Sequence, residues 1–118
     1  FRADPKLLRR LLENLLGNAL KYNPEGTTIY VSLRVKKQTI HLTVADDGVG
    51  IPEEIARQVF DPFITGSSAR TSGEGTGLGL SIVKRIVSLH GGQIRLAMPP
   101  RVPYRTEFQI TFPQNHLL

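Results

Sequence analysis

Two alternating segments joined by a short connection constrain the fold of this chain more than any other feature. Apolar side chains occupy alternate positions in residues 29–35 and again in residues 40–44, with Lys36-Lys37-Gln38 between them. Successive side chains of a strand point to opposite faces, so the pattern predicts an antiparallel hairpin with one apolar face. Parallel neighbours need a much longer crossover, and a doubly wound parallel sheet therefore fits this chain poorly.

Helical spacing of apolar residues predicts three helices, over residues 5–20, 52–59 and 78–89. Asp4-Pro5 suits the start of the first helix, because Asp caps free backbone N–H groups and Pro fits the first turn. Asn23-Pro24-Glu25-Gly26 ends that helix, since the residue before a proline avoids helical dihedral angles.

Two further strands are predicted near residues 93–97 and 104–112, and residues 61–76 form a long loop rich in Gly, Ser and Thr. Loops of that length in a compact domain are usually functional. Hairpin strands interspersed with helices predict an α+β fold, a two-layer sandwich in which helices cover one face of a mixed, mostly antiparallel sheet. We expect residues 1–118 to form one domain.

The composition is that of a soluble globular protein, with 40% hydrophobic and 21% charged residues. No apolar run reaches the ~18 residues that a membrane span needs. Without cysteine, the chain can form no disulfide, thiolate metal site or thiol nucleophile. The net charge of +5 favours anionic partners, but the basic residues are scattered, and we expect no nucleic-acid binding. Because the chain does not begin with Met, we expect it to be part of a longer protein.

The first predicted helix carries a stripe that changes from apolar to polar. Its members share one face by their spacing of three or four residues: Leu7, Leu11, Asn14, Asn18 and Tyr22. A buried amide without a partner costs about 1–3 kcal/mol, so the two amides on this stripe need partners. Either they bond to local backbone and water, or they face a polar cavity in which an amide oxygen can ligate Mg2+.

Two glycine-containing segments extend this hypothesis. The first is Asp46-Asp47-Gly48-Val49-Gly50-Ile51. Its carboxylate can accept a hydrogen bond from an amino group, and its glycines let the backbone approach a flat ligand. The alternative is a simple turn, for which Asp-Gly is a common sequence. Gly73-Glu74-Gly75-Thr76-Gly77-Leu78-Gly79-Leu80 leads into a helix, whose N-terminus can bind phosphate. This run is neither a P-loop nor a dinucleotide-binding pattern, and a merely flexible loop is an alternative. Lys21, near Asn18 on the helix, could meet such a phosphate.

In their order along the chain, these segments resemble the ATP-binding catalytic domain of sensor histidine kinases, which belongs to the superfamily of gyrase, Hsp90 and MutL ATPases. Residues 13–22 resemble its N box, residues 46–51 its G1 box, residues 59–63 its F box and residues 75–84 its G2 box. The resemblance extends over nearly the whole chain and implies a Bergerat-type ATP-binding fold.

The resemblance also implies roles for individual residues. Asn14, Asn18 and Lys21 would be catalytic, with Asn18 as the Mg2+ ligand and Lys21 on a phosphate. Asp46 would accept a hydrogen bond from the adenine amino group, and residues 61–76 would form a lid over the ATP. The other nucleotide-binding residues would be Tyr22, Gly48, Gly50, Ile51, Phe60, Arg70, Gly75, Thr76, Gly77, Leu78, Gly79, Leu80 and Thr106.

Position 14 separates the subfamilies that the resemblance includes. ATP-hydrolysing relatives carry there a Glu that activates water, whereas Asn14 has an amide that cannot act as a base. Glu13 is adjacent but is rotated by about 100° on the helix. We therefore expect the chain to hold and orient ATP but to hydrolyse it slowly.

Two departures accompany the resemblance. Pro103-Tyr104-Arg105-Thr106, after a proline-rich stretch, replaces the Gly-x-Gly-Thr turn that is usual before the last strand. The phosphoacceptor histidine motif, which the family carries on a separate helical hairpin, is absent, and His90 at a helix end is not taken for the acceptor.

These features together predict a protein histidine kinase domain that binds ATP and Mg2+ and donates the γ-phosphate to a histidine on a separate dimerisation domain. A response regulator would act downstream. We expect a cytoplasmic domain, in a parent protein that could be anchored at the inner face of the cell membrane. The alternatives are a self-sufficient ATPase that uses Glu13 and a non-catalytic nucleotide- or partner-binding module.

Overall fold

The computed structural model describes residues 3–61 and 79–114. Every predicted helix and strand has a counterpart, although the short helix predicted to reach residue 59 ends earlier and the last strand begins two residues later than predicted. No helix within the described ranges is long and apolar enough to cross a membrane. The elements are α1 (Pro5–Tyr22), β1 (Ile29–Lys36), β2 (Thr39–Asp46), α2 (Glu53–Ala56), α3 (Gly79–Leu89), β3 (Gln93–Leu96) and β4 (Thr106–Pro113).

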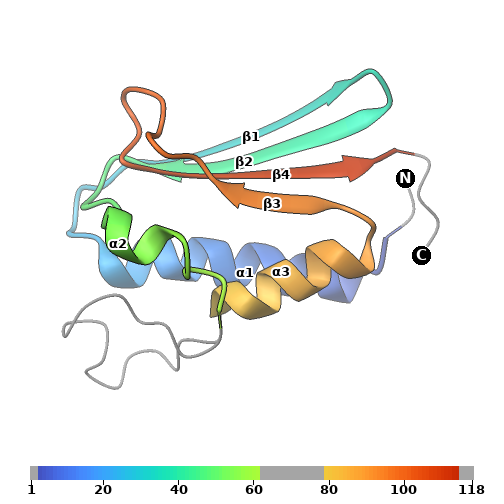
Figure 1. Cartoon of the computed structure of the whole chain (residues 1–118), viewed down its shortest axis with the longest axis horizontal. Helices are drawn as coiled ribbons and strands as arrows, with labels where there is room; N and C mark the ends of the chain where they lie inside the picture. The colour runs from blue at the N-terminus through green and yellow to red at the C-terminus, as the bar shows by residue number, and fades with distance from the viewer. Residues whose placement is uncertain (1–2, 62–78, 115–118) are drawn as a thin grey trace.

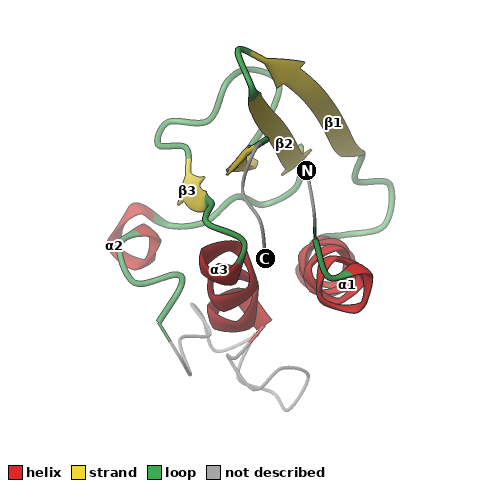
Figure 2. Ribbon diagram, turned by 90° about the vertical axis from the view of Figure 1, so that its right-hand side faces the viewer, coloured by secondary structure: helices red, strands yellow, loops and turns green. Residues whose placement is uncertain are grey.

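The strands form one four-stranded sheet in the order β1-β2-β4-β3, and each pair of described neighbours is antiparallel. Helices α1 and α3 lie side by side beneath one face of this sheet (Figures 1 and 2). The predicted two-layer α+β sandwich is therefore confirmed. Strand β4 inserts between β2 and β3, so the last strand of the chain becomes a central strand.

The β1–β2 hairpin closes through a two-residue turn, one residue shorter than the connection expected from the sequence. Lys36 pairs with Thr39, which leaves Lys37 and Gln38 in the turn. Both have positive φ angles, 50° and 62°. Such a turn matches the right-handed twist of the strands and usually contains Asn or Gly. The Lys-Gln sequence therefore does not predict it.

Helix α1 has the ends that the sequence predicts. The Asp4 carboxylate accepts hydrogen bonds from the backbone N–H groups of Lys6 and Leu7. At the other end Asn23 is extended, as expected before a proline, and its Nδ2 donates to the Ala19 carbonyl over 2.9 Å.

His90 connects the end of α3 with the start of α1. Its imidazole is fully buried, Nε2 accepts a hydrogen bond from the Asp4 backbone N–H over 3.1 Å, and Nδ1 lies 2.8 Å from the Ile86 carbonyl. An Nδ1–H donor and an Nε2 acceptor together require the neutral imidazole. The chain then leaves α3 through Gly91, whose φ is +71°.

The hydrophobic core lies between the helices and the facing side of the sheet. It is built from the inward stripes of α1 and α3 and from alternate residues of β2 and β4: Leu11, Leu15, Val44, Val83, Ile86, Val87, Phe108, Ile110 and Phe112.

The apolar face predicted for the first strand is largely exposed. Val31, Leu33 and Val35 have 55%, 68% and 63% of their surface accessible. They share the helix-facing side with buried and partly buried residues of β2. However, α1 packs against β2 and α3 against β3, whereas β1 lies at the edge of the sheet (Figure 2). Alternation therefore reports which way a side chain points but not whether a helix covers it.

Candidate functional site

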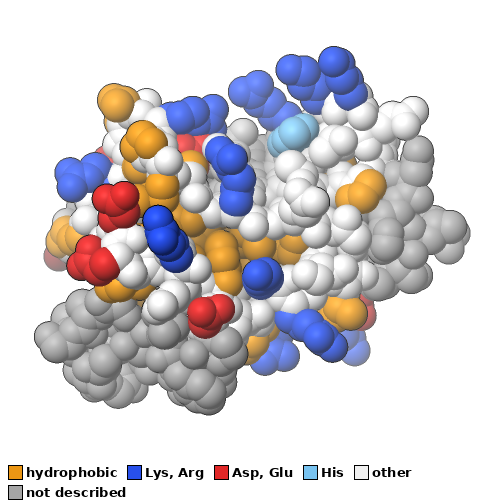
Figure 3. All heavy atoms as spheres, viewed as in Figure 1, with side chains coloured by type: hydrophobic (Ala, Val, Ile, Leu, Met, Phe, Trp, Pro, Cys, Tyr) orange, Lys and Arg blue, Asp and Glu red, His pale blue; other side chains and the backbone are white. Residues whose placement is uncertain are grey.

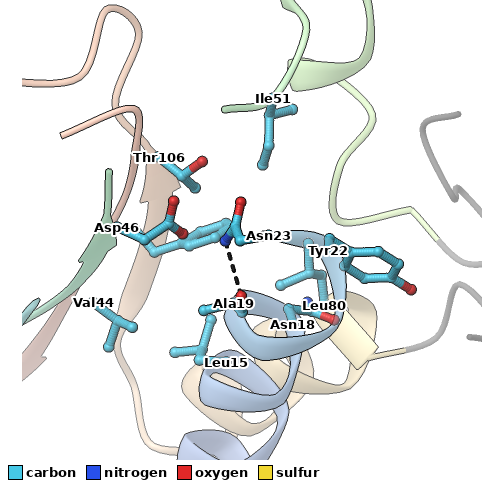
Figure 4. Close-up of a pocket in the computed structure, with 11 residues that line it drawn as sticks. Leu15, Asn18, Ala19, Tyr22, Asn23, Val44, Asp46, Ile51, Leu80 and Thr106 are labelled. Atoms are coloured by element: carbon cyan, nitrogen blue, oxygen red, sulfur yellow. Dashed lines mark hydrogen bonds between the residues drawn. The ribbon is translucent and has the colours of Figure 1, made fainter. Parts of the chain in front are cut away.

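A cavity opens between the end of α1, the end of β2, the start of β4 and the start of α3 (Figure 4). Its volume is about 30 Å³, room for about two water molecules. Polar groups line one part of it and apolar side chains the rest. The lining residues are Leu15, Asn18, Ala19, Tyr22, Asn23, Val44, Asp46, Ile51, Leu80, Thr106 and Phe108.

Asp46 and Thr106 form the polar floor of the cavity. They are directly paired across β2 and β4, and only 5% and 7% of their surfaces are exposed. One Asp46 oxygen, Oδ1, accepts a hydrogen bond from the Gly48 N–H over 2.9 Å. A carboxylate is rarely buried unless it is hydrogen-bonded, and Asp46 has such a bond at the end of β2.

Asn18 and Asn14 are amides one turn apart on α1, and Asn18 lies in the cavity lining. The Oδ1 of Asn18 lies 3.7 Å from the position that a Cβ on Gly79 would occupy. One turn earlier, Asn14 lies outside the cavity lining, and its buried Nδ2 has no hydrogen-bond partner among the described residues. A buried amide in this state has spare capacity for a ligand or a water molecule.

Asn23 is a cavity residue that the sequence reading missed. Because Asn23 precedes Pro24, the sequence predicts only that the helix ends there. In the structure its Oδ1 accepts a hydrogen bond from the Val49 N–H over 3.0 Å, and its Nδ2 donates to the Ala19 carbonyl. The side chain thus ties the turn after β2 to α1. The sequence does carry a signal for the bond to Ala19, because Asn favours helix ends, where its side chain can bond free backbone groups four residues earlier.

The two glycines of the turn after β2 have structural neighbours of their own. A Cβ on Gly48 would overlap the Asn23 side chain. Gly50 has a φ of +77°, and a Cβ there would lie 3.1 Å from the Arg105 carbonyl oxygen. Both positions therefore require glycine for packing of the protein itself, and their contact with a nucleotide stays a prediction.

Other predicted site residues lie away from the cavity lining. The Phe60 ring packs against Phe108 with 6.0 Å between ring centroids, and Lys84 Nζ lies 5.9 Å from the Phe60 centroid. Lys21 is exposed in the last turn of α1. Predicted residues outside the described ranges are Arg70, Gly75, Thr76, Gly77 and Leu78.

The donor set of the cavity suits a hard cation only together with other ligands. Within residues 3–61 and 79–114, no three His, Cys, Asp or Glu side chains converge on a point where they could hold a metal. Asn18 offers an amide oxygen, and Mg2+ commonly takes one or two protein oxygens and completes its shell with water and phosphate. The residues present therefore fit Mg2+ delivered with a nucleotide.

An ion pair between the largely exposed Arg101 and the buried Glu107 holds the loop that precedes Thr106. Glu107 is fully buried; its Oε1 accepts from the Arg101 backbone N–H over 2.9 Å and its Oε2 from Arg101 Nε over 2.8 Å and Gln109 Nε2 over 2.9 Å. Burial alone would raise the pKa of Glu107, but the hydrogen bonds from Arg101 and Gln109 and the Arg101 charge outweigh it and lower that pKa. The same carboxylate raises the pKa of Arg101.

This loop contacts the cavity floor directly. The Arg105 N–H donates to the Asp46 carbonyl over 2.7 Å, and the Tyr104 ring lies 5.0 Å from the Tyr30 ring, centroid to centroid. The turn that departs from the family pattern therefore still delivers the backbone of Thr106 to the end of β2.

Residues 3–116 match the family model described as histidine kinase-, DNA gyrase B- and HSP90-like ATPase. The chain belongs to this family. Its fold is that of an ATP-binding domain of the histidine kinase type.

Similar proteins with curated descriptions are sensor kinases. The chain is 46% identical over 96 residues to the sensor histidine kinase YvrG of Bacillus subtilis, covering 81% of this chain and 17% of that protein. It is 38% identical over 119 residues to the circadian input-output histidine kinase CikA of Synechococcus elongatus, covering 100% of this chain and 16% of that protein. The chain thus spans about a sixth of the length of these two relatives.

Solved structures give the same assignment. The mycobacterial sensor histidine kinase MprB matches with a TM-score of 0.82 and 36% identity over 98% of this chain and 77% of that chain. ShkA, solved in complex with AMPPNP, matches with a TM-score of 0.71 and 27% identity over 91% of this chain and 21% of that chain.

Proposed function

We propose that this domain binds Mg-ATP and donates the γ-phosphate to a histidine on a separate dimerisation domain of a two-component sensor kinase. The observation that supports the proposal most is the meeting of three elements at one cavity. Asp46, at the end of β2, lines one end of the cavity. Asn18 of α1 lines the other end, where it faces the beginning of α3. A response regulator would receive the phosphoryl group, and the domain would act in the cytoplasm.

The floor of the cavity suits the base of the nucleotide. The Asp46 carboxylate can accept from an exocyclic amino group, and the Thr106 hydroxyl beside it can donate or accept. Leu15, Val44 and Phe108 supply apolar surface for a flat ring. Because the cavity holds only about 30 Å³, we expect side chains at its mouth to move apart when a purine enters.

The opposite end suits the phosphates. The described start of α3 lies close to Asn18, and the positive end of the helix dipole would stabilise an anion there. Mg2+ held by Asn18 and the phosphates would neutralise charge that develops during phosphoryl transfer. The Asn14 amide, one turn away on α1, has no hydrogen-bond partner among the described residues, and in this proposal it bonds a water molecule or a phosphate oxygen of the bound nucleotide.

No general base for water stands on α1 at this site. Position 14 carries an amide, and Glu13 is exposed and paired with Arg9 Nε over 3.7 Å. A self-sufficient ATPase would need a carboxylate aimed at the attacking water. The arrangement therefore supports transfer to an external acceptor over hydrolysis.

The proposal is tested with ATP labelled on the γ-phosphate. We expect calorimetry to show Mg-ATP binding, slow release of labelled phosphate by the domain alone, and transfer of label to the histidine-bearing helical domain of a similar sensor kinase supplied in trans. Replacing that acceptor histidine by Gln is the matched control and should abolish labelling. Rapid hydrolysis that is lost in Glu13→Gln would favour the ATPase, and absence of ATP binding would favour a non-catalytic module.

A further inference from the structure

The face of the sheet that points away from the helices is polar and basic. Directly opposed residues of an antiparallel pair share a face, so the register defines continuous rows across the strands. Three of these rows contain no acidic residue and include three strong cations: Ser32–Thr43–Gln109–Arg95, Arg34–His41–Thr111–Gln93 and Lys36–Thr39–Pro113. The neighbouring row, Tyr30–Ala45–Glu107, contains one acid.

A groove of about 290 Å³ runs over this face between β1, β2 and β4, with Arg101 at its side. The side chains of Arg34 and Lys36 line it together with His41 and hydroxyl groups of neighbouring strands. Figure 3 shows Lys and Arg side chains gathered around a histidine toward the β1–β2 end of the molecule, with no acidic side chain among them in this view.

No described residue neutralises the positive charges of Arg34 and Lys36 in this groove. Within the described part of the chain, neither Arg34 nor Lys36 forms an ion pair. The nearest acid on this face, Glu107, is fully buried and already holds Arg101, whose guanidinium NH2 lies 2.6 Å from Glu107 Oε2. Uncompensated like charges in a groove raise the local concentration of anions.

The spacing and chemistry of the groove favour an acidic peptide. Arg34 and Lys36 are two residues apart on one strand, about 6.6–6.8 Å, which is also the repeat of same-side residues in an extended chain. Hydroxyls of Ser32 and Thr43 and the amide of Gln109 offer donors and acceptors for a peptide backbone. Among the residues that line the groove, His41 carries a small imidazole ring and none is Phe, Tyr or Trp, the larger rings on which nucleobases stack, which disfavours single-stranded nucleic acid.

We propose that this outer groove docks an extended, acidic segment of a partner protein, with carboxylates at alternate positions against Arg34 and Lys36. The groove lies on the opposite face of the sheet from the cavity that contains Asp46 and Thr106. Docking and nucleotide binding are therefore separable, and the failure of one would leave the other intact.

The test measures fluorescence anisotropy of a labelled peptide of alternating Glu and Ser at low ionic strength, with a Gln-Ser peptide for comparison. Arg34→Glu combined with Lys36→Glu should weaken binding by about tenfold or more, because attraction becomes repulsion at two positions. The matched control is Lys6→Glu with Arg10→Glu, the same charge change at exposed positions of α1, for which we expect less than about a twofold change.

Several results would overturn the proposal. They are the absence of Glu-Ser peptide binding by the unaltered chain, equal losses in the two double variants, and tighter binding of oligothymidylate of equal charge. Amide shifts in NMR spectra should locate the peptide at Ser32, Thr43 and Thr111; shifts confined to α1 would contradict the assignment. ATP affinity should be unchanged in both variants. If the Glu variant fails to fold, Arg34→Gln with Lys36→Gln tests the same contacts and should still weaken binding.

Discussion

Asp46 and Thr106 lie directly opposite each other in the β2–β4 pair, and both buried side chains reach the same cavity. They come from strands that are far apart in the sequence and from turns of different composition. Their pairing gives the cavity a carboxylate and a hydroxyl side by side, a combination that can accept from and donate to one heterocyclic edge.

Replacing Asp46 by Asn should weaken ATP binding by about tenfold to a hundredfold. The amide keeps one oxygen for the Gly48 N–H, but it cannot supply the charged acceptor, whose hydrogen bond with a ligand donor is worth about 1.5–3 kcal/mol. Calorimetry with Mg-ATP measures the loss. Asp47→Asn is the control, because this exposed neighbour bonds the Thr28 N–H outside the cavity. Unchanged affinity in Asp46→Asn would contradict the adenine assignment.

Thr106→Val removes the hydroxyl but keeps the branched shape of the side chain. Loss of one neutral hydrogen bond is worth about 0.5–1.5 kcal/mol, so we expect ATP affinity to fall by about two- to tenfold. Thr106→Ser should retain most of the affinity, and Thr111→Val, on the outer face of the same strand, should have no effect. If Ser and Val reduce affinity equally, shape rather than the hydroxyl is what matters at this position.

Asn18→Ala should weaken Mg-ATP more than metal-free ATP. A direct metal ligand contributes at least as much as an outer-shell partner, whose loss costs about tenfold or more in metal affinity. The measurement is a pair of calorimetric titrations, one with Mg2+ and one with a chelator. The same loss in both titrations would argue for a direct contact of the amide with the nucleotide and against a metal ligand.

Glu107→Gln should destabilise the domain at neutral pH by about 1–3 kcal/mol, since a buried charged hydrogen-bond acceptor becomes an amide beside Arg101. The pKa of Glu107 is lower in the folded state than its ordinary value. Its ionised form therefore stabilises the fold above the ordinary pKa, and this contribution is lost as the pH falls through the folded-state pKa.

Urea unfolding of the two proteins over a series of pH values measures this effect. The difference in the free energy of unfolding should be largest at neutral pH and should shrink in acid. Exposed Glu25→Gln provides a reference in which little change is expected. A difference that stays constant with pH would mean that Glu107 acts through its shape and not through its charge.

Local signals in the sequence predicted the elements and part of the site. The Asp4-Pro5 start, the stripe of Asn14 and Asn18, and the alternation in residues 29–35 each depend on neighbours within a few positions, and the structure confirms the start, the helix and the hairpin. The same locality explains what the sequence missed. Asn23 bonds Val49 across 26 residues, and no pattern around Pro24 reports that contact.

The sequence by itself determined the secondary structure, the fold class and the polar residues of α1 and of the turn after β2, because periodicity and capping are properties of contiguous residues. Only the tertiary structure decided that β4 lies between β2 and β3, which sets Thr106 against Asp46. It also decided that Val31 and Leu33 remain exposed while Glu107 is buried. Strand order and helix coverage arise from contacts between distant segments, whose free energies no local pattern records.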